Sequence, residues 1–195
     1  RTIGIESVAS PFASDTASTP EASVAGAVVA AIARTEPAIS SADGVFMAFT
    51  SVAILAPTPG GSGTQIFLRN AQTNTTTLVS RNAAGDASNG ASSESAISTN
   101  GQFVVFTSVA PNLAPIPGGS GSQIFLRDTT GNTTTLVSRD TGGSAGNGAS
   151  SQPAISATSG QFVAFTSLAT NLAAIPGGSG SHIFLRDTQG HQTTL

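Results

Sequence analysis

The chain has 195 residues, of which only 9% are charged, and its seven basic residues, all Arg, and ten acidic residues give a formal net charge of −3. This balance excludes the cationic surface that nucleic-acid binding requires. Hydrophobic residues make up 38% of the sequence, which is enough for a buried core, and the absence of Cys excludes disulfides and thiol chemistry.

The N-terminal part of the chain is not repetitive. Residues 1–8 alternate polar and apolar side chains, which predicts an outer β-strand. Residues 24–33 form the longest apolar run, far shorter than the roughly 20 residues of a membrane span, so no span is predicted. We interpret this run as a strand or short helix that caps the first repeat, or as a subunit contact. The start at Arg1, without a basic-then-apolar signal, suggests a processed or excised chain and fits export.

A block of about 58 residues then occurs three times. One constant phrase has the form Phe-x-x-Phe-Thr-Ser and occupies residues 46–51, 103–108 and 162–167. The other reads Ile-Phe-Leu-Arg and occupies residues 66–69, 124–127 and 183–186. Regular spacing of this length indicates stacked structural units.

The second block illustrates the strand signals. A short strand is expected at 96–98, followed by a hairpin turn at Thr99-Asn100-Gly101 and a second strand over 102–108. Phe103 and Phe106 are three residues apart and therefore lie on opposite faces of that strand, both of which are apolar. A strand buried on both faces indicates a sheet with other sheets packed on either side.

A long connection rich in Pro and Gly, residues 109–123, leads to a third strand at 124–127. Residues 128–132 form a tight turn in which Asp128 accepts backbone N–H groups and Gly131 supplies a positive φ. A Thr-rich fourth strand over 133–138 is expected in an outer, half-exposed position.

Four short antiparallel strands per block, joined by turns, predict an all-β fold of three four-stranded propeller-type blades. We assign residues 1–195 to a single repeat domain. Its parts are an extra N-terminal strand with a non-repeating segment (1–35) and blades at 36–81, 94–139 and 152–195, the last with a truncated outer strand. Because a closed propeller needs about 4 to 8 blades, three blades form half of a six-bladed propeller or an open array.

The third block resembles a known repeat at residues 153–156, 160–167, 171–172 and 183–187. The pattern is similar to the propeller repeat of the Tol-type (TolB-like) family of exported bacterial proteins. The resemblance covers residues 36–195 and implies the fold, since this repeat serves as a scaffold for unrelated functions. Family members often carry acidic residues before the third strand, where a cation would bind. The loops here, 59–63, 117–121 and 176–180, contain only Pro, Gly and Ser, so we predict no metal ion.

Few side chains suggest chemistry. Arg69, Arg127 and Arg186 end the third strands, and we expect a repeated contact between blades, with a ligand-binding ring as the alternative. His182 and His191 replace Gln and Asn of the other blades and are interpreted as structural. Since no Ser lies in a nucleophile elbow and no Lys follows the glycine loops, we predict no catalytic residue, no cofactor and no enzyme activity. Two sequons make Asn74 and Asn132 candidate glycosylation sites.

The shortage of blades suggests that the chain associates with itself. We expect a non-enzymatic, exported structural protein that self-assembles through its blade ends and by exchange of its N-terminal strand. The product would be an extracellular or cell-surface assembly, either a dimer or a head-to-tail filament, with the periplasm as the alternative location. A propeller that binds a glycan or peptide, and a fragment of a larger propeller, are the alternative functions. The expected subunit contacts are Ile3, Ile5, Val8, Val24, Val28, Val29, Ile32, Thr193 and Leu195.

Overall fold

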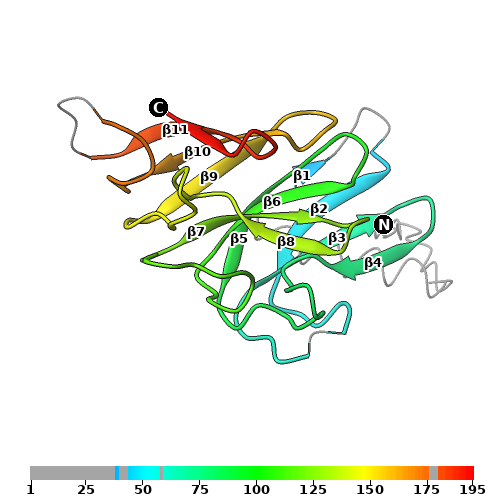
Figure 1. Ribbon diagram of the computed structural model, residues 1–195. Coiled ribbons are helices and arrows are strands. Elements are labelled where there is room, and N and C mark those ends of the chain that lie inside the picture. The colour runs from blue at the N-terminus through cyan, green and yellow to red at the C-terminus, as the bar shows by residue number, and fades with distance from the viewer. Residues whose placement is uncertain (1–37, 40–43, 58, 176–179) are drawn as a thin grey trace, which may run out of the picture.

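The computed structural model describes residues 38–39, 44–57, 59–175 and 180–195. Within these ranges every regular element is a β-strand. The strands form three four-stranded antiparallel sheets that follow one another along the chain (Figure 1), and we call them blades 1, 2 and 3. The prediction of an all-β fold built from three four-stranded blades is confirmed.

Strands that are consecutive in sequence are neighbours in each sheet. Blade 1 contains β1 (Ala38–Ile39), β2 (Phe46–Ser51), β3 (Gln65–Asn70) and β4 (Thr75–Leu78). Blade 2 contains β5 (Ser92–Ile97), β6 (Phe103–Ser108), β7 (Gln123–Asp128) and β8 (Thr133–Leu136). Blade 3 contains β9 (Ser150–Ile155), β10 (Phe162–Ser167), β11 (His182–Asp187) and β12 (Gln192–Thr194).

The first strand of a blade is longer than the sequence predicted. In blade 2 it begins at Ser92 and not at residue 96. Its register with β6 shifts between Ser93 and Ala96, and Glu94 has a φ of 51°. Gln152 has the same conformation in β9, with a φ of 53°. This β-bulge breaks the two-residue alternation, which is why the strand signal covered only its second half.

The turn between the third and fourth strands also differs from the prediction in one respect. The Asp128 Oδ1 atom accepts the N–H groups of Thr130 and Gly131, each at 2.9 Å, as expected. The positive φ, however, lies at Asn132 (55°) and not at Gly131. Glycine is not required at this position, because Thr73 occupies it in the corresponding turn of blade 1 and makes the same kind of N–H bond, to Asn70.

The fourth strand ends earlier than predicted. Exposed and buried residues alternate along β8, which fits the predicted outer position. It ends at Leu136 because the chain then turns onto β7: the Val137 N–H donates to the Ile124 carbonyl, and the Ser138 hydroxyl accepts the Ile124 N–H.

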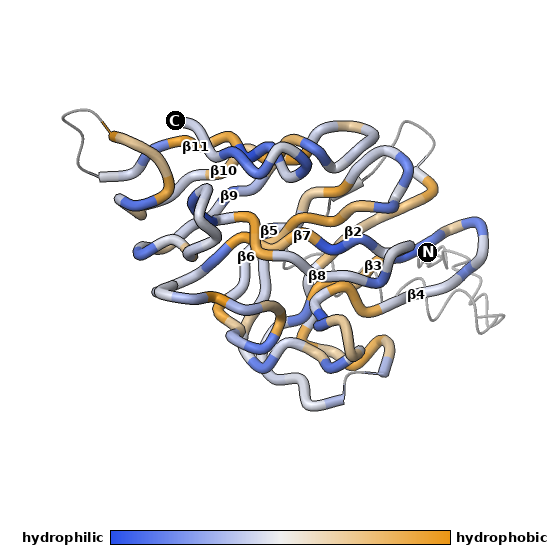
Figure 2. Tube along the Cα trace, in the orientation of Figure 1, coloured by the Kyte–Doolittle hydropathy of each residue, from blue (hydrophilic) through white to orange (hydrophobic). Residues whose placement is uncertain are grey.

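The hydrophobic core lies between the blades. Figure 2 shows apolar stretches along the middle strands, and the middle strands of blade 2 are buried on both faces as predicted. We call the face of a blade that packs on the next blade its forward face, and the opposite one its backward face. In blade 2 the forward face carries Val105, Ile124 and Leu126, and the backward face carries Val104, Phe106 and Phe125.

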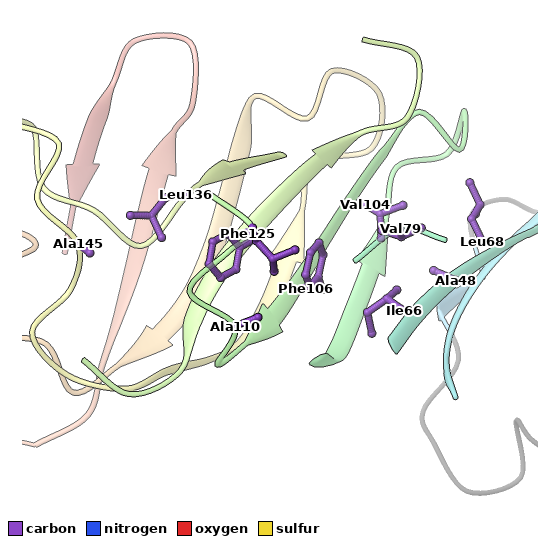
Figure 3. Close-up of a cluster of buried hydrophobic side chains, with 11 residues drawn as sticks. Ala48, Ile66, Leu68, Val79, Val104, Phe106, Ala110, Phe125, Leu136 and Ala145 are labelled. Atoms are coloured by element: carbon purple, nitrogen blue, oxygen red, sulfur yellow. The ribbon is translucent and has the colours of Figure 1, made fainter. Parts of the chain in front are cut away.

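We call the contact between a forward face and the next backward face a seam. In the first seam, Ala48, Ile66 and Leu68 of blade 1 pack against the backward face of blade 2 (Figure 3). In the second seam, the forward face of blade 2 packs against Val163, Phe165 and Phe184 of blade 3. Each backward face carries one stacked Phe pair with ring centroids 5.9 to 6.0 Å apart.

A phenylalanine ring lies on a turn glycine of the next blade in both seams. A Cβ atom on Gly101 would lie 2.4 Å from the ring of Phe46, and a Cβ on Gly160 would lie 2.6 Å from the ring of Phe103. The two glycines have φ values of 71° and 62°. These positions therefore require glycine twice over, for the backbone conformation and for the approach of the ring.

Replacing Gly160 by Ala tests the importance of this contact. We expect Gly160→Ala to lower the free energy of unfolding by roughly 2–4 kcal/mol, because it adds a positive-φ penalty to a steric clash. The control is Gly118→Ala, since Gly118 has a φ of 71° and its added Cβ would meet nothing within 4 Å. Urea unfolding should show a loss of only about 1 kcal/mol for the control. Equal losses would mean that the ring contact does not matter.

Candidate functional site

The arginines that end the third strands of blades 2 and 3 lie inside the seams. Arg127 is 1% exposed, and its guanidinium donates to the carbonyl groups of Arg81 and Asn82 in the preceding linker and to the Thr134 hydroxyl. It also donates to the Asn132 side-chain oxygen. Arg186 repeats this contact, with Arg139, Asp140 and Thr193 in the corresponding places.

The electrostatic environment of Arg127 is unfavourable for a cation. Burial lowers its pKa to about 10, the neighbouring Arg81 lowers it as well, and Asp128 acts weakly in the opposite direction. The hydrogen-bond acceptors of Arg127 are carbonyl, hydroxyl and carboxamide oxygens and not carboxylates. These bonds compensate the lost hydration and fix the linker of one blade to the third strand of the next. The predicted contact between blades is therefore what these side chains make, and they end in separate seams, not in a shared ring.

Arg69 occupies the same position in blade 1, where the residues that precede β1 lie outside the described ranges. It is only partly buried, and its guanidinium donates to the Asn74 carbonyl and the Thr76 hydroxyl of its own hairpin. Asn70 stands where the other blades have Asp, yet its Oδ1 atom accepts the N–H groups of Gln72 and Thr73 in the same kind of turn.

A buried polar network forms a second polar contact at each seam. In blade 1 the Gln65 amide donates to the Ser62 and Ser88 carbonyls and accepts from the hydroxyls of Ser80 and Ser88. In blade 2 the Gln123 amide donates to the Ser120 and Gly146 carbonyls and accepts from the Ser138 hydroxyl; Gly146 stands in place of Ser88 and has no hydroxyl to donate. The recurrence of Gln and Ser at the same spacing in two blades was the sequence signal for this network, and we did not use it.

His182 takes the position of Gln65 and Gln123 in blade 3. Its Nδ1 atom lies 3.1 Å from the Gly180 carbonyl, its ring is tilted against Phe184, and the residue is partly exposed. His191 occupies the turn position of Asn132, with a φ of 54° and its Nδ1 atom 3.5 Å from Arg139. Both histidines thus make the local contacts expected of structural variants.

A shallow groove runs beside the first seam. Its volume is about 490 Å³, and its walls are the linker residues Asn82, Ala83 and Ala84, the loop residues 111–115, and Thr134. Asn82 and Thr134 are held by Arg127 through their backbone carbonyl and hydroxyl, respectively. This groove combines apolar walls with fixed polar groups, but it is wide open to solvent.

In the described ranges, His, Asp and Glu side chains do not gather into any group of three or more that could hold a metal ion. The same ranges contain no helix with the length and apolar character needed to cross a bilayer.

The predicted contact and modification sites fall into three groups. Residues 3, 5, 8, 24, 28, 29 and 32 lie outside the described residues. Thr193 is 5% exposed because its hydroxyl takes part in the Arg186 contact, whereas Leu195 is 54% exposed. Asn74 and Asn132 lie in exposed turns, with φ values of 56° and 55°. Their glycosylation stays a prediction.

The forward face of blade 3 is one of the blade ends expected to make contacts, but its residues are not among the predicted contact residues. Its apolar side chains are open to solvent: Phe162 is 42% exposed, Ile183 70% and Leu185 44%. The residues are the same as in the other blades, so only their place in the last sheet of the array distinguishes them.

Replacing Arg127 by Met tests its role as a seam contact. We expect Arg127→Met to lower the free energy of unfolding by roughly 2–4 kcal/mol, because buried carbonyl groups of the preceding linker lose their donor. Arg69→Met is the control, and it should cost less than about 1 kcal/mol because its bonds remain within one exposed hairpin. Chemical denaturation measures both. A similar cost for the two variants would contradict the seam role.

Comparison with known proteins identifies the fold. Neither a protein-family model nor a curated protein sequence matches the chain. The crystal structure of TolB from Acinetobacter baumannii matches with a TM-score of 0.50 and 16% identity, over 82% of this chain and 31% of that one. The structure of a protein assigned as TolB from Agrobacterium tumefaciens matches with a TM-score of 0.51 and 14% identity, over 81% of this chain and 47% of that one. The chain thus spans less than half the length of these proteins. The similarity and the three blades together show that the chain has a TolB-like β-propeller fold.

Proposed function

We propose that the chain is a non-enzymatic, exported building block that associates with a second copy of itself through the forward face of blade 3. A single observation carries this proposal. Ile66 and Ile124 are 0% exposed in the two seams, whereas their counterpart Ile183 is 70% exposed. Leu68 and Leu126 are 6% and 7% exposed, whereas their counterpart Leu185 is 44% exposed.

The free energy available from burying this exposed face is limited. Full burial of one Leu, Ile or Phe side chain stabilises a protein by roughly 1.5–3 kcal/mol, and because Phe162, Ile183 and Leu185 are 42%, 70% and 44% exposed, the three together contribute only about 2–5 kcal/mol. Association itself costs an estimated 4–15 kcal/mol in lost freedom, which is as large or larger. The exposed face can therefore drive association only with additional contacts around it. Reversible assembly is the expected behaviour.

Strand exchange would supply such an additional contact. β12 is the outermost strand of blade 3 and pairs on one side with β11. An extra strand, for which we propose residues 1–8 of another copy, would extend this sheet through main-chain hydrogen bonds.

Two alternatives have specific support. The chain spans 31% and 47% of the TolB chains that it resembles, which supports a fragment of a larger propeller whose further blade covers the same face. The groove beside the first seam supports a module that binds a glycan or peptide. Export, to the cell surface, the medium or the periplasm, is common to these proposals and rests on the family resemblance.

Mass measurement in solution tests the main proposal. We expect analytical ultracentrifugation to show a dimer or larger particles, and Ile183→Asp to convert them to monomers because it places a charge in the apolar contact. The control is Leu168→Asp. Leu168 is 54% exposed, and its counterpart Val109 remains 55% exposed although both faces of blade 2 are covered. A monomeric wild-type chain at high concentration would contradict self-association and favour a larger propeller.

Deleting residues 1–8 tests strand exchange separately. If this segment pairs with β12 of another copy, the deletion should weaken association at least tenfold without lowering the thermal midpoint of the monomer by more than a few degrees. Sedimentation of the truncated chain at the wild-type value would refute exchange and leave the contact through blade 3 in place.

A further inference from the structure

We propose that two copies join head to tail. The forward face of blade 3 in one copy docks on the open end of the backward face of blade 1 in the next, and the Phe162 ring lies on Gly44. This inference rests on the proposed self-association and specifies the second surface, which the exposed face of blade 3 does not reveal by itself.

Gly44 corresponds to the two glycines that contact a Phe ring, but no Phe ring of the described residues contacts it. It occupies the turn before the second strand, as Gly101 and Gly160 do, and its φ of 63° matches their values of 71° and 62°. A Cβ on either of the other two would collide with a Phe ring, yet a Cβ on Gly44 would meet nothing within 4 Å. Among the described residues, therefore, nothing occupies the receiving half of this contact on blade 1.

Phe162 supplies the ring that would complete the contact at Gly44. Its counterparts Phe46 and Phe103 each cover a glycine of the following blade, whereas Phe162 is 42% exposed. The two unmatched halves lie on opposite faces of the array, one on the forward face of blade 3 and one at the backward face of blade 1. A second copy, placed as blade 3 is placed on blade 2, would match them.

At the end that carries Gly44, no other described sheet covers the backward face of blade 1. Met47, Arg69 and Thr76 are partly exposed there. Their counterparts in blade 2, Val104, Arg127 and Thr134, are 0%, 1% and 8% exposed because a seam covers them.

The far end of the same face is already closed. Phe49 and Phe67 are 0% exposed and pack with Leu78 and Ala87, and the partly buried side chains of Met47, Leu55 and Ala56 pack against this cluster. The contact between copies therefore uses only part of a full seam, at the end where Gly44 and Met47 lie.

The side chains at the open end suit a contact that can form and separate. Met47 is the single methionine of the chain and replaces the β-branched Val104 and Val163. An unbranched thioether adapts its shape to a partner at little cost, so it can pack against Phe162 and Leu185 without the exact fit of an internal seam. Within the described residues Arg69 donates only through Nη1, which leaves its other N–H groups for carbonyl groups of the incoming copy.

The geometry of the proposal differs from a symmetric contact. If two forward faces met each other, both copies would use the same surface and Gly44 would take no part. A head-to-tail contact uses two different surfaces, and it either closes after a small number of copies or continues as a filament. Substitution at Gly44 separates the two arrangements.

The decisive variant is Gly44→Asn. Asparagine tolerates a positive φ, and the chain already holds Asn74 and Asn132 at 56° and 55°, so the turn should keep its conformation. The added Cβ would occupy the space of the incoming Phe162 ring. We expect association at least tenfold weaker than in the wild type, measured by analytical ultracentrifugation over a range of concentrations.

Two further variants support the interpretation. Gly118→Asn is the matched control, because Gly118 has a φ of 71° and open space around it but lies in a loop of blade 2, so association should be unchanged. Phe162→Ala removes the ring from the other side of the contact, with no change in blade 1, and should weaken association as Gly44→Asn does. Wild-type association of both Gly44→Asn and Phe162→Ala would overturn the proposal.

A mixing experiment gives the sharpest test. Ile183→Asp blocks the forward face and Gly44→Asn blocks the backward face, so each variant alone should be monomeric. An equal mixture should form a two-copy particle, since the open face of each variant fits the open face of the other. A mixture that stays monomeric would overturn the head-to-tail contact. Dimers of Gly44→Asn alone would overturn it too while leaving self-association intact, and a monomeric wild type would instead refute the proposed function.

Discussion

A sheet with apolar side chains on both faces has to be covered on both sides, and this requirement governs the structure of the chain. The β6 and β7 strands satisfy it through blades 1 and 3, and their side chains are almost completely removed from water. The two larger core clusters each combine side chains of two successive blades, whereas the cluster around Phe49 and Phe67 lies within blade 1 and its adjoining loops. The seams are therefore the units of stability, and the blades are only their building blocks.

Apolar packing alone would not fix how one sheet lies on another, since many rotations bury a similar area. Polar contacts of two kinds accompany each seam. Buried arginines such as Arg127 bind main-chain carbonyl groups of the preceding linker, and Gln65 and Gln123 join the third strand to the linker that follows. These bonds are directional and lose much of their value when a sheet is displaced by one residue, so they define the register.

Much of the architecture could be predicted because the same structural unit occurs three times in the sequence, and residues that recur in each copy mark its strands and turns. The second, third and fourth strands followed from Phe spacing, the Ile-Phe-Leu-Arg phrase and the alternation of Thr. The bulge at Glu94 escaped because an extra residue destroys the alternation on which strand prediction depends. The positive φ at Asn132 was assigned to Gly131 because glycine is the commonest residue with a positive φ, whereas this turn places Asn74, Asn132 or His191 in that conformation.

The candidate contact surface was harder to predict for a different reason. Ile183 has the same sequence context as Ile66 and Ile124, and nothing local marks it as exposed. Exposure depends on whether another sheet follows, which is a property of the whole array. Gly44 is likewise indistinguishable from Gly101 until the neighbouring ring is seen to be missing.

The placement of each ring and its glycine on opposite sides of a blade also bears on how such chains evolve. Each repeat supplies the Phe ring for the seam that follows it and the glycine for the seam that precedes it. Duplication or loss of a whole repeat therefore leaves a ring opposite a glycine in every remaining seam. Blade number can therefore change by gene duplication without any compensating substitution. Exchange of a half repeat would join mismatched halves, and selection should accordingly favour recombination breakpoints in the linkers between sheets.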